Sequence, residues 1–324
     1  MSHHPSKPTA LTIHIGISAC LLGEEVRYNG GHSNSKLCSN EFSQYFEYRR
    51  FCPEVAAGFS IPRPTMRLIG DPNKPQLRFS NNPDEDLTDQ LISGFEHQLE
   101  NCDDLDGYIL MKNSPSCGME RIKIYQENGH PHMQRGRGLF AQALMSKYPL
   151  LPVEEDGRLN DAPLRENFVM RVYAHANFRH EVMEQPSYHN LLQFHSSYKY
   201  MLMAHSQRDY RELGQLLAVS NKLPLDELIP RYKACFMQAI SEPAKRGNHC
   251  NTMQHILGYL KKTVSNDERR GVQNVISQYH REEVNLATPM ALLNHYIQRT
   301  GSDYIRAQRY FEPYPAALGL RNQV

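Results

Sequence analysis

The sequence predicts an α/β domain with a mainly parallel, Rossmann-like sheet over residues 1–158, followed by an all-α helical bundle over residues 159–324. Strand-like and helix-like segments alternate in the first half, which is the order typical of α/β domains. In the second half, every long segment repeats its apolar residues at helical spacing, and such amphipathic helices must pack against one another. A chain of 324 residues also has the length of two ordinary domains.

The apolar patterns of the first half place its strands and helices. Short runs that alternate apolar and polar residues, or that are rich in strand-forming residues, predict strands at 11–19, 105–112 and 150–155. Apolar residues recur at helical spacing in 41–50, 86–102 and 138–148. A turn-rich segment, 153–163, marks the expected boundary between the domains.

The second half contains helical patterns throughout and no comparable strand. Helices are expected at 164–182, 188–205, 210–221, 225–240, 250–264, 267–283 and 289–301. Prolines punctuate them at Pro186, Pro224, Pro230 and Pro289, and Asp267 is the expected N-cap of the sixth helix.

The composition is that of a soluble globular protein. Charged residues make up 22% and apolar residues 40%, with a net charge of +1, and no apolar run approaches the roughly 20 residues that span a membrane. The N-terminal segment lacks the apolar core of a secretory signal, so the seven cysteines are expected to be cytoplasmic thiols or metal ligands. The net charge is −4 over residues 1–158 and +5 over 159–324, which suggests different partners for the two halves.

Three cysteines lie where a ligand site is expected. Cys20 ends the first strand, Cys52 follows the segment 41–50, and Cys117 comes shortly after the strand at 105–112. In open α/β sheets, ligands bind outside the carboxyl ends of the strands. Three thiolates at long spacing suit an iron–sulfur cluster with one open iron, whereas structural zinc prefers four closely spaced ligands. The alternative is that the three are ordinary buried core residues. The other cysteines are interpreted as core or surface thiols, although one of them could supply a fourth ligand: Cys38, Cys102, Cys235 and Cys250.

Groups that handle protons and anions surround these cysteines in the sequence. Glu54 is a candidate general acid or base, or simply a cap for a nearby turn. Ser114 and Ser116 can donate to a developing anion or close the turn that contains them. Possible substrate anchors are Arg27, Arg63, Arg67 and Lys112. The segment RGRG at 135–138 leads into a helix, where a phosphate could dock.

The first half resembles the thiouracil desulfidase (TudS-like) family. The segments SACLLG, VRYNGGH, CPE, PRP, NSPSCG and GRGLF occur in the family's order within residues 11–158. The resemblance implies an α/β fold, and a [4Fe–4S] cluster held by three cysteines that match Cys20, Cys52 and Cys117. Its open iron would take the substrate's sulfur, and the catalytic carboxylate and serine would be Glu54 and Ser114. One departure is Arg67, where many stand-alone members carry Glu, and this suits a more anionic substrate.

The second half resembles the YbgA-type helical domain. The segments LLQFHSSYKYMLMAHS, YRELG, NTMQHILGYLKK, PMALLNHYI and YPAALGLRN carry the likeness over residues 165–324. Together, the two halves resemble fused bacterial desulfidases proposed to act on 4-thiouridine in tRNA, with free thiouracil or thionucleotides as further candidate substrates. The basic residues that could contact tRNA phosphates, or simply solubilise the surface, are Lys199, Lys245, Arg246, Lys261, Lys262, Arg269 and Arg270.

Two other functions are compatible with the same residues. A tRNA sulfur-insertion enzyme can also use three cysteines and an open iron, but it usually needs ATP, and no phosphate loop of that kind occurs in the sequence. An iron–sulfur RNA-binding sensor would need neither the carboxylate nor the serines beside the cysteines. Sulfide release from thiolated tRNA separates the three hypotheses.

Overall fold

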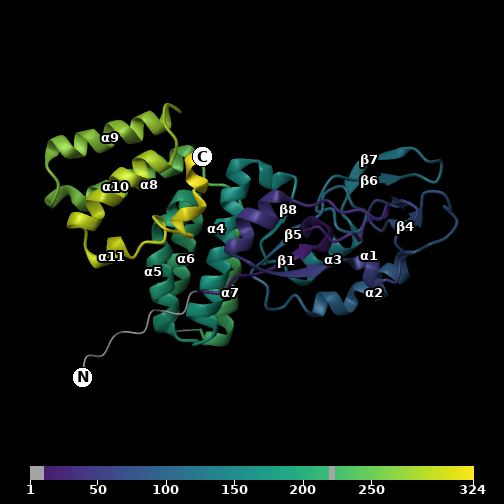
Figure 1. Ribbon diagram of the computed structural model, residues 1–324. Helices are drawn as coiled ribbons and strands as arrows, with labels where there is room; N and C mark the ends of the chain where they lie inside the picture. Colours follow the sequence, from purple (N-terminus) through teal and green to yellow (C-terminus); the bar gives the residue numbers. More distant parts are fainter. Residues whose placement is uncertain (1–10, 219–222) are drawn as a thin grey trace, which may run out of the picture. The chain divides into compact units, whose positions relative to one another are not determined.

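The computed structural model describes residues 11–218 and 223–324, which divide into two compact units, Met1–Gly157 and Arg158–Val324 (Figure 1). Residues 1–10, where we expect no secretory segment, and residues 219–221, at the end of an expected helix, lie outside this description. Within the described part, no helix has both the length and the apolar character needed to cross a bilayer.

The first unit contains the expected parallel sheet, with strand order β2-β1-β5-β8. Its strands are β1 (His14–Ser18), β2 (Glu47–Phe51), β5 (Gly107–Leu110) and β8 (Val153–Glu155). Every neighbouring pair is parallel, so all four carboxyl ends lie at one edge of the sheet. β1 and β5 occupy the centre, where both faces are covered, and all residues of β5 are buried.

The prediction of a helix at 41–50 is wrong. The chain there forms a π-helical turn (Leu37–Glu41) and a 3-10 turn (Phe42–Gln44), and then enters the edge strand β2. Phe42 and Phe46 are buried at helical spacing, which produces the misleading pattern. The chain forms a strand here because it pairs with β1, from Glu47 opposite His14 to Phe51 opposite Ser18. Such pairing with a distant segment cannot be recognised in the local sequence.

A second four-stranded sheet, of order β4-β3-β6-β7, is absent from the sequence prediction. Its strands are β3 (Met66–Ile69), β4 (Gln76–Phe79), β6 (Ile122–Tyr125) and β7 (Pro131–Gly136). β3 and β6 are parallel, while β3–β4 and β6–β7 are antiparallel hairpins. Most of these strands have only four residues, and their charged faces obscure the apolar alternation.

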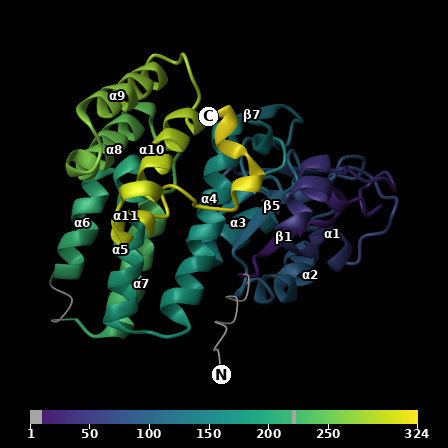
Figure 2. The same ribbon diagram turned by 60° about the vertical axis from the view of Figure 1, so that its left-hand side comes forward.

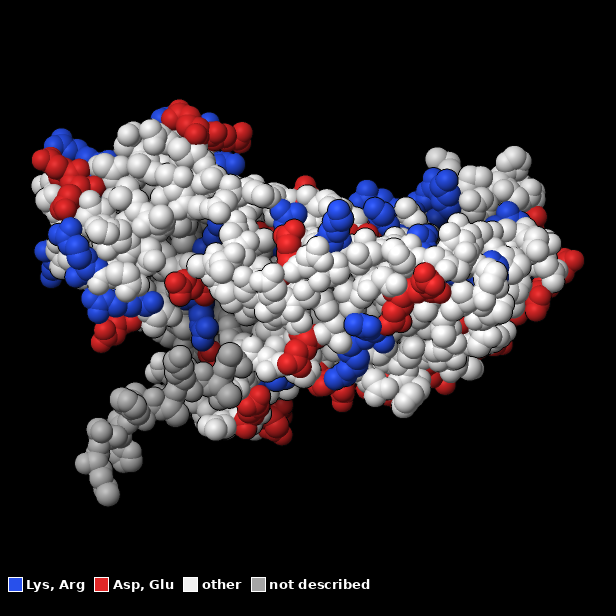
Figure 3. All heavy atoms as spheres, viewed as in Figure 1, with Lys and Arg blue, Asp and Glu red and all other residues white. Residues whose placement is uncertain are grey.

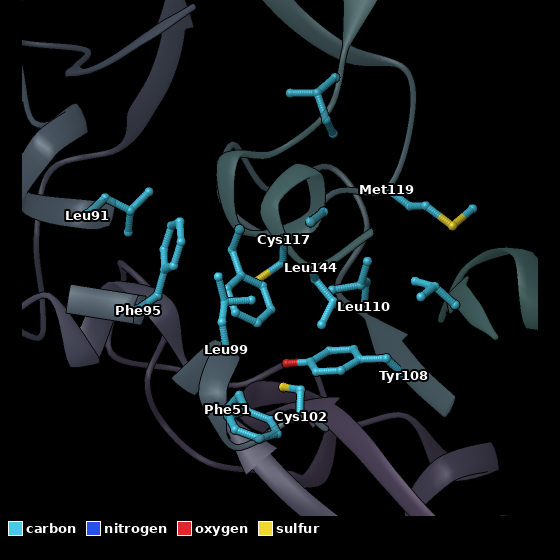
Figure 4. Packing of buried hydrophobic residues seen from close by; sticks show 14 of the residues in the cluster. Phe51, Leu91, Phe95, Leu99, Cys102, Tyr108, Leu110, Cys117, Met119 and Leu144 are labelled. Carbon is cyan, nitrogen blue, oxygen red and sulfur yellow. The ribbon is translucent and has the colours of Figure 1, made fainter. Parts of the chain in front are cut away.

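Two helices cover the core of the first unit. α2 (Thr88–Glu100) buries Leu91, Phe95 and Leu99, which share one helix face at four-residue spacing. α3 (Leu139–Lys147) contributes Phe140 and other apolar residues, and the rings of Phe95 and Phe140 meet edge to face at 5.4 Å. Figure 4 shows the three residues of α2 facing the side chains of β5 and α3. The third helix, α1 (Pro53–Ala56), is a single turn.

The described part of the second unit is helical and contains no strand, which confirms the expected change of pattern (Figure 2). Its helices are α4 (Ala162–Phe178), α5 (Tyr188–His205), α6 (Gln207–Ala218), α7 (Leu225–Ala239), α8 (Arg246–Tyr259), α9 (Asn266–His280), α10 (Ala287–Thr300) and α11 (Asp303–Arg306).

The structure differs from the sequence prediction at two helix boundaries. Pro230 lies inside α7 rather than at an end. The N-cap of α9 is Ser265, not Asp267: the Ser265 hydroxyl accepts from the Glu268 amide, and the Glu268 carboxylate accepts from the Ser265 amide at 2.9 Å. This reciprocal pair satisfies two free amides at once, which a lone aspartate cannot do.

Candidate active site

Three cysteines from separate segments meet at one edge of the parallel sheet. Cys20 lies in the 3-10 turn Ala19–Leu22 directly after β1, and Cys52 follows β2 as the N-cap of α1. Cys117 lies in the loop that follows β5. Because β2, β1 and β5 are adjacent and parallel, their following residues converge on the same side.

The three thiols line a single cavity of about 480 Å³. The charged and hydroxyl groups on its wall include most of the residues expected from the sequence: Arg27, Glu54, Arg63, Lys112 and Ser114. Phe51, Met66 and Met111 supply apolar walls. A largely apolar pocket with a few polar groups is the usual form of a small-molecule site.

Burial strongly favours the neutral form of these thiols. It raises the pKa of Cys20 to about 12 and the pKa of Cys117 well above its ordinary value, and it also raises the pKa of Cys52. The cysteines reinforce one another's shifts by charge repulsion, and the Arg27 guanidinium opposes the shift at Cys20. All three would therefore become thiolates only with a compensating positive charge, which a bound metal group supplies.

The cysteines are not arranged around a single ion. Among the residues that the structure describes, no three histidine, cysteine or acidic side chains are grouped closely enough to hold one metal ion. An iron–sulfur cluster places its cysteine ligands on different iron atoms and therefore needs a wider arrangement. The other cysteines of the described chain do not line this cavity: Cys38, Cys102 and Cys250 are buried elsewhere, and Cys235 is exposed.

The Glu54 carboxylate is held from two sides. Arg63 donates to it from Nε at 3.0 Å and from a terminal nitrogen, and the Ser116 hydroxyl donates at 2.9 Å. The Arg63 side chain is only 2% exposed and also donates to the carbonyls of Val26 and Ser60. Arg63, expected as a substrate anchor, thus has its donors engaged inside the protein and positions Glu54. No local sequence signal indicates this pairing, because Arg63 lies nine residues beyond its partner.

The Cys117 loop is shaped by its own serine and by a helix. The Ser114 hydroxyl oxygen accepts from the amides of Ser116 and Cys117, at 3.2 and 3.0 Å. Ser114 lines the cavity, whereas Ser116 is fully buried behind Glu54. The first amides of α3 donate to the carbonyls of Pro115 and Ser116. The helix that follows RGRG therefore supports the cysteine loop, and these amides are not free for the phosphate considered there.

Gly138, the N-cap of α3, makes this support possible. A Cβ at this position would lie 2.5 Å from the Ser116 carbonyl carbon and oxygen. Gly138→Ala should therefore push the cysteine loop away and lower the free energy of unfolding by about 1–3 kcal/mol, as measured by denaturant titration. Gly214→Ala in α6 is the control, because a Cβ there meets nothing within 4 Å. A Gly138→Ala protein as stable as this control would contradict the proposed packing.

Comparisons with known proteins match the two units separately. The 2-thiouracil desulfurase family model matches residues 15–156, and the model of a protein family of unknown function, DUF1722, matches residues 199–315. The uncharacterized protein YbgA of Escherichia coli (strain K12) is 33% identical over 133 residues, which are 41% of this chain and 79% of that protein. The uncharacterized protein YbbK of Bacillus subtilis (strain 168) is 32% identical over 108 residues, 32% of this chain and 71% of that protein.

The chain belongs to the families of YbgA and YbbK. It combines a 2-thiouracil desulfurase domain with a DUF1722 (YbgA-type) domain. A solved structure described as a [4Fe–4S]-dependent thiouracil desulfidase, TudS, is 29% identical, with a TM-score of 0.36. The match covers 46% of this chain and 95% of that one. The cysteine cavity lies entirely in the desulfurase unit.

Arg67 is separated from the other expected anchors of the desulfurase unit. It lies on β3 and lines a neighbouring cavity rather than the one with the cysteines. Its guanidinium stands over the ring of Tyr125 at 5.3 Å. Arg27 and Lys112 remain on the wall of the cysteine cavity, so they are the expected anchors that can reach a ligand there.

The basic residues of the YbgA-type unit fall into distinct groups. Lys261 and Lys262 are exposed in the 3-10 turn after α8, and Arg269 and Arg270 follow in the first half of α9. Lys245 lies at the opposite end of α8, about 20 Å away by the helical rise.

Two further basic residues of this unit make internal contacts. Arg246 donates to the Tyr279 carbonyl at 2.8 Å and stands 4.5 Å from the centre of the Tyr279 ring. The Lys199 ammonium lies within 6 Å of the rings of Tyr200 and Tyr304. These contacts give both side chains a structural role in the helical unit.

Proposed function

We propose that this protein is an iron–sulfur-dependent desulfidase that removes sulfur from a thiolated uracil, 4-thiouridine in tRNA, and releases uridine and hydrogen sulfide. The observation that carries the proposal is the convergence of three thiols, two of them buried and one half-buried, and a fixed carboxylate on one cavity. The match of residues 15–156 to the 2-thiouracil desulfurase family model supports the desulfidase activity.

The residues of the cavity fit a [4Fe–4S] cluster. Cys20, Cys52 and Cys117 would be its ligands, which leaves one iron without a protein ligand. Arg27 and Lys112, on the same wall, would offset the negative charge of the thiolates. When bound, such a cluster supplies a soft Lewis acid that accepts a thiocarbonyl sulfur in preference to a carbonyl oxygen.

The chain itself supplies the proton chemistry. The apolar walls, with Phe51 and Met111, would hold the pyrimidine ring and limit the access of water. Glu54, fixed by Arg63 and Ser116, would take a proton from the water that attacks the ring carbon and return it to the departing sulfur. Ser114 would orient the ring or donate to its developing charge. The overall reaction exchanges C=S and water for C=O and hydrogen sulfide, with no net redox change.

The test is an oxygen-free purification followed by addition of tRNA that contains 4-thiouridine. The proposal expects a brown protein, loss of the thiouridine absorbance and release of one sulfide per base. A brown protein that binds the tRNA without releasing sulfide would instead be a sensor, and one that adds thiouridine to unmodified tRNA would be a sulfur-insertion enzyme. Free thiouracil and thionucleotides, assayed in parallel, define the substrate range.

The helical unit should present the tRNA to the cavity through its exposed basic residues. Lys261→Gln/Lys262→Gln should weaken tRNA binding and reduce the salt slope of binding by about 1.4–1.8, because each lost phosphate contact removes about 0.7–0.9. Filter binding at several salt concentrations measures this slope. Arg211→Gln/Arg231→Gln removes the same charge from exposed positions of α6 and α7 and is the control. An equal slope in both variants would remove these lysines from the tRNA interface.

A further inference from the structure

The second sheet of the desulfurase unit carries one basic residue on each strand, all at the same level. Arg67 of β3 lies directly opposite Arg78 of β4, and Lys123 of β6 lies opposite Arg135 of β7. The parallel pairing of Leu68 with Ile124 brings Arg67 and Lys123 to the same level on the neighbouring central strands. We call Arg78, Arg67, Lys123 and Arg135 the basic row.

The basic row lies on the face of this sheet opposite the buried core, where Lys123 and Arg135 are exposed and Arg67 and Arg78 are half-buried. Leu68, Leu77, Ile122 and Ile124 point to the other face and belong to the buried core. Side chains alternate between the faces of a strand, so the cations at 67, 78 and 123 point away from that core. In the space-filling view, Lys and Arg side chains gather over the region where β6 and β7 lie in Figure 1 (Figure 3).

Folding alone does not explain this arrangement. Like charges directly opposite each other on neighbouring strands are destabilising. Arg78 is neutralised by Glu127 at 3.0 Å, but the structure, over the residues it describes, gives no acidic partner to Arg67, Lys123 or Arg135. The Nε of Arg67 is buried without a hydrogen-bond partner. Three cations without counter-charges in one row indicate a site for an anion.

A cavity of about 460 Å³ lies beside the basic row and adjoins the cysteine cavity. Arg67 and Lys123 line it together with Arg121, whose guanidinium is paired with the neighbouring Glu120. Met66, Asn113 and Pro115 line both this cavity and the one that holds the cysteines. A ligand that occupies the cysteine cavity would therefore have an anion site next to it across a shared wall.

We propose that the basic row and its cavity bind a phosphate group of the nucleotide whose thiouracil base enters the cysteine cavity. This inference rests on the proposed function. A base and the phosphates of its nucleotide are separated by one ribose, which matches two adjoining cavities of different character. Arginine and lysine are the side chains that bind phosphate oxygens most strongly. The phosphate can belong to a mononucleotide or to an RNA backbone, since the chemistry is the same.

Product binding tests this site without requiring turnover. Calorimetry on the full-length protein compares uridine 5′-monophosphate with uridine, and we expect the phosphate to tighten binding by about tenfold or more, as charge-assisted hydrogen bonds do. Lys123→Gln/Arg135→Gln should bring this ratio close to one while leaving uridine binding unchanged. Lys74→Gln/Lys147→Gln, which removes two exposed cations elsewhere in the unit, is the control and should keep the ratio.

The stability of the same variant separates ligand binding from a structural role. Because Lys123 and Arg135 repel each other, their replacement should leave the melting temperature of the free protein unchanged or raise it. A clear drop in melting temperature together with weaker binding of both ligands would assign the two cations to folding and overturn the proposal. An undiminished preference for the phosphate in the variant would also overturn it.

Turnover and salt dependence distinguish the source of the phosphate. If 4-thiouridine 5′-monophosphate releases sulfide faster than 4-thiouridine, and the variant removes the difference, the site serves mononucleotides. If only thiolated RNA responds, with a salt slope reduced by about 0.7–0.9 for each lost contact, it reads an RNA backbone. A protein that releases no sulfide from 4-thiouridine, its monophosphate or thiolated RNA would refute the proposed function. The phosphate site would still be tested independently, because the preference for uridine 5′-monophosphate over uridine is measured by binding alone.

Discussion

Cys117→Ala should abolish both the visible absorbance and the desulfidase activity. Cys117 is buried on the cavity wall and its loop is fixed by Ser114 and by the first turn of α3. Within the described residues, no cysteine besides Cys20 and Cys52 lines this cavity to replace it. Loss of one of three ligands should release the cluster, and sulfide release should fall by more than a thousandfold, about 4 kcal/mol of transition-state stabilisation. Iron and sulfide analysis after anaerobic purification, followed by turnover assays, measures both effects.

Cys102→Ala is the matched control for this change. Cys102 is also buried in the first unit and packs in the same apolar core, but it does not line the cavity. Its replacement should reduce stability modestly and leave the absorbance and the activity in place. A Cys117→Ala protein that keeps its iron and its activity would show that the cluster is held elsewhere or is absent.

Glu54→Gln should keep the cluster and lower the turnover rate by about 10²–10⁴-fold, the range typical of a lost general acid or base. Glutamine is preferable to alanine because it preserves the volume: its amide oxygen can still accept from Arg63, and its amide nitrogen can donate to the Ser116 hydroxyl oxygen. In Glu54→Ala, by contrast, Arg63 would remain buried and unpaired, and such a charge costs about 3–5 kcal/mol. Turnover and unfolding, measured on both variants, separate the catalytic effect from the structural one.

Arg63 provides the control for this carboxylate. Because its guanidinium donates to Glu54 and to two carbonyls, Arg63→Gln should lower both stability and turnover. Glu54→Gln keeps a hydrogen-bonding group beside the guanidinium, so it should lower turnover strongly and stability less than Glu54→Ala does. If Glu54→Gln releases sulfide at the normal rate with the cluster intact, Glu54 is only an internal partner of Arg63, and the proton must be moved by another group.

The candidate site could be anticipated where its residues are tied to strand ends. Cys20 and Cys117 follow strands that are visible as apolar runs, and parallel strands must end at the same edge. Cys52 was expected at the same edge although the strand before it was missed, because the motif CPE and its place in the chain carried the inference. The prediction that the three thiols meet therefore depended on the order of the segments along the chain, and not on a correct secondary structure for each segment.

The partners of the site residues could not be anticipated in the same way. Arg63 and Ser116 come from different loops, and their contacts with Glu54 depend on how those loops fold over α1. The second sheet was also hidden, since its strands are short and its two hairpins are joined only by the long-range pairing of β3 with β6, Leu68 with Ile124. The basic row exists only through this pairing, because its four residues are scattered along the sequence.

The division into an α/β half and a helical half, the parallel sheet, and the family motifs with their cysteines can all be predicted from the amino-acid sequence. These features depend on apolar periodicity and short local segments, which a linear chain displays directly. Three features emerge only from the folded chain: which expected anchors line the cysteine cavity, the pairing of Arg63 with Glu54, and the place of Arg67 in the basic row beside a second cavity. The physical reason is that hydrogen bonds, burial and charge repulsion between distant segments arise only when strand pairing brings those segments together.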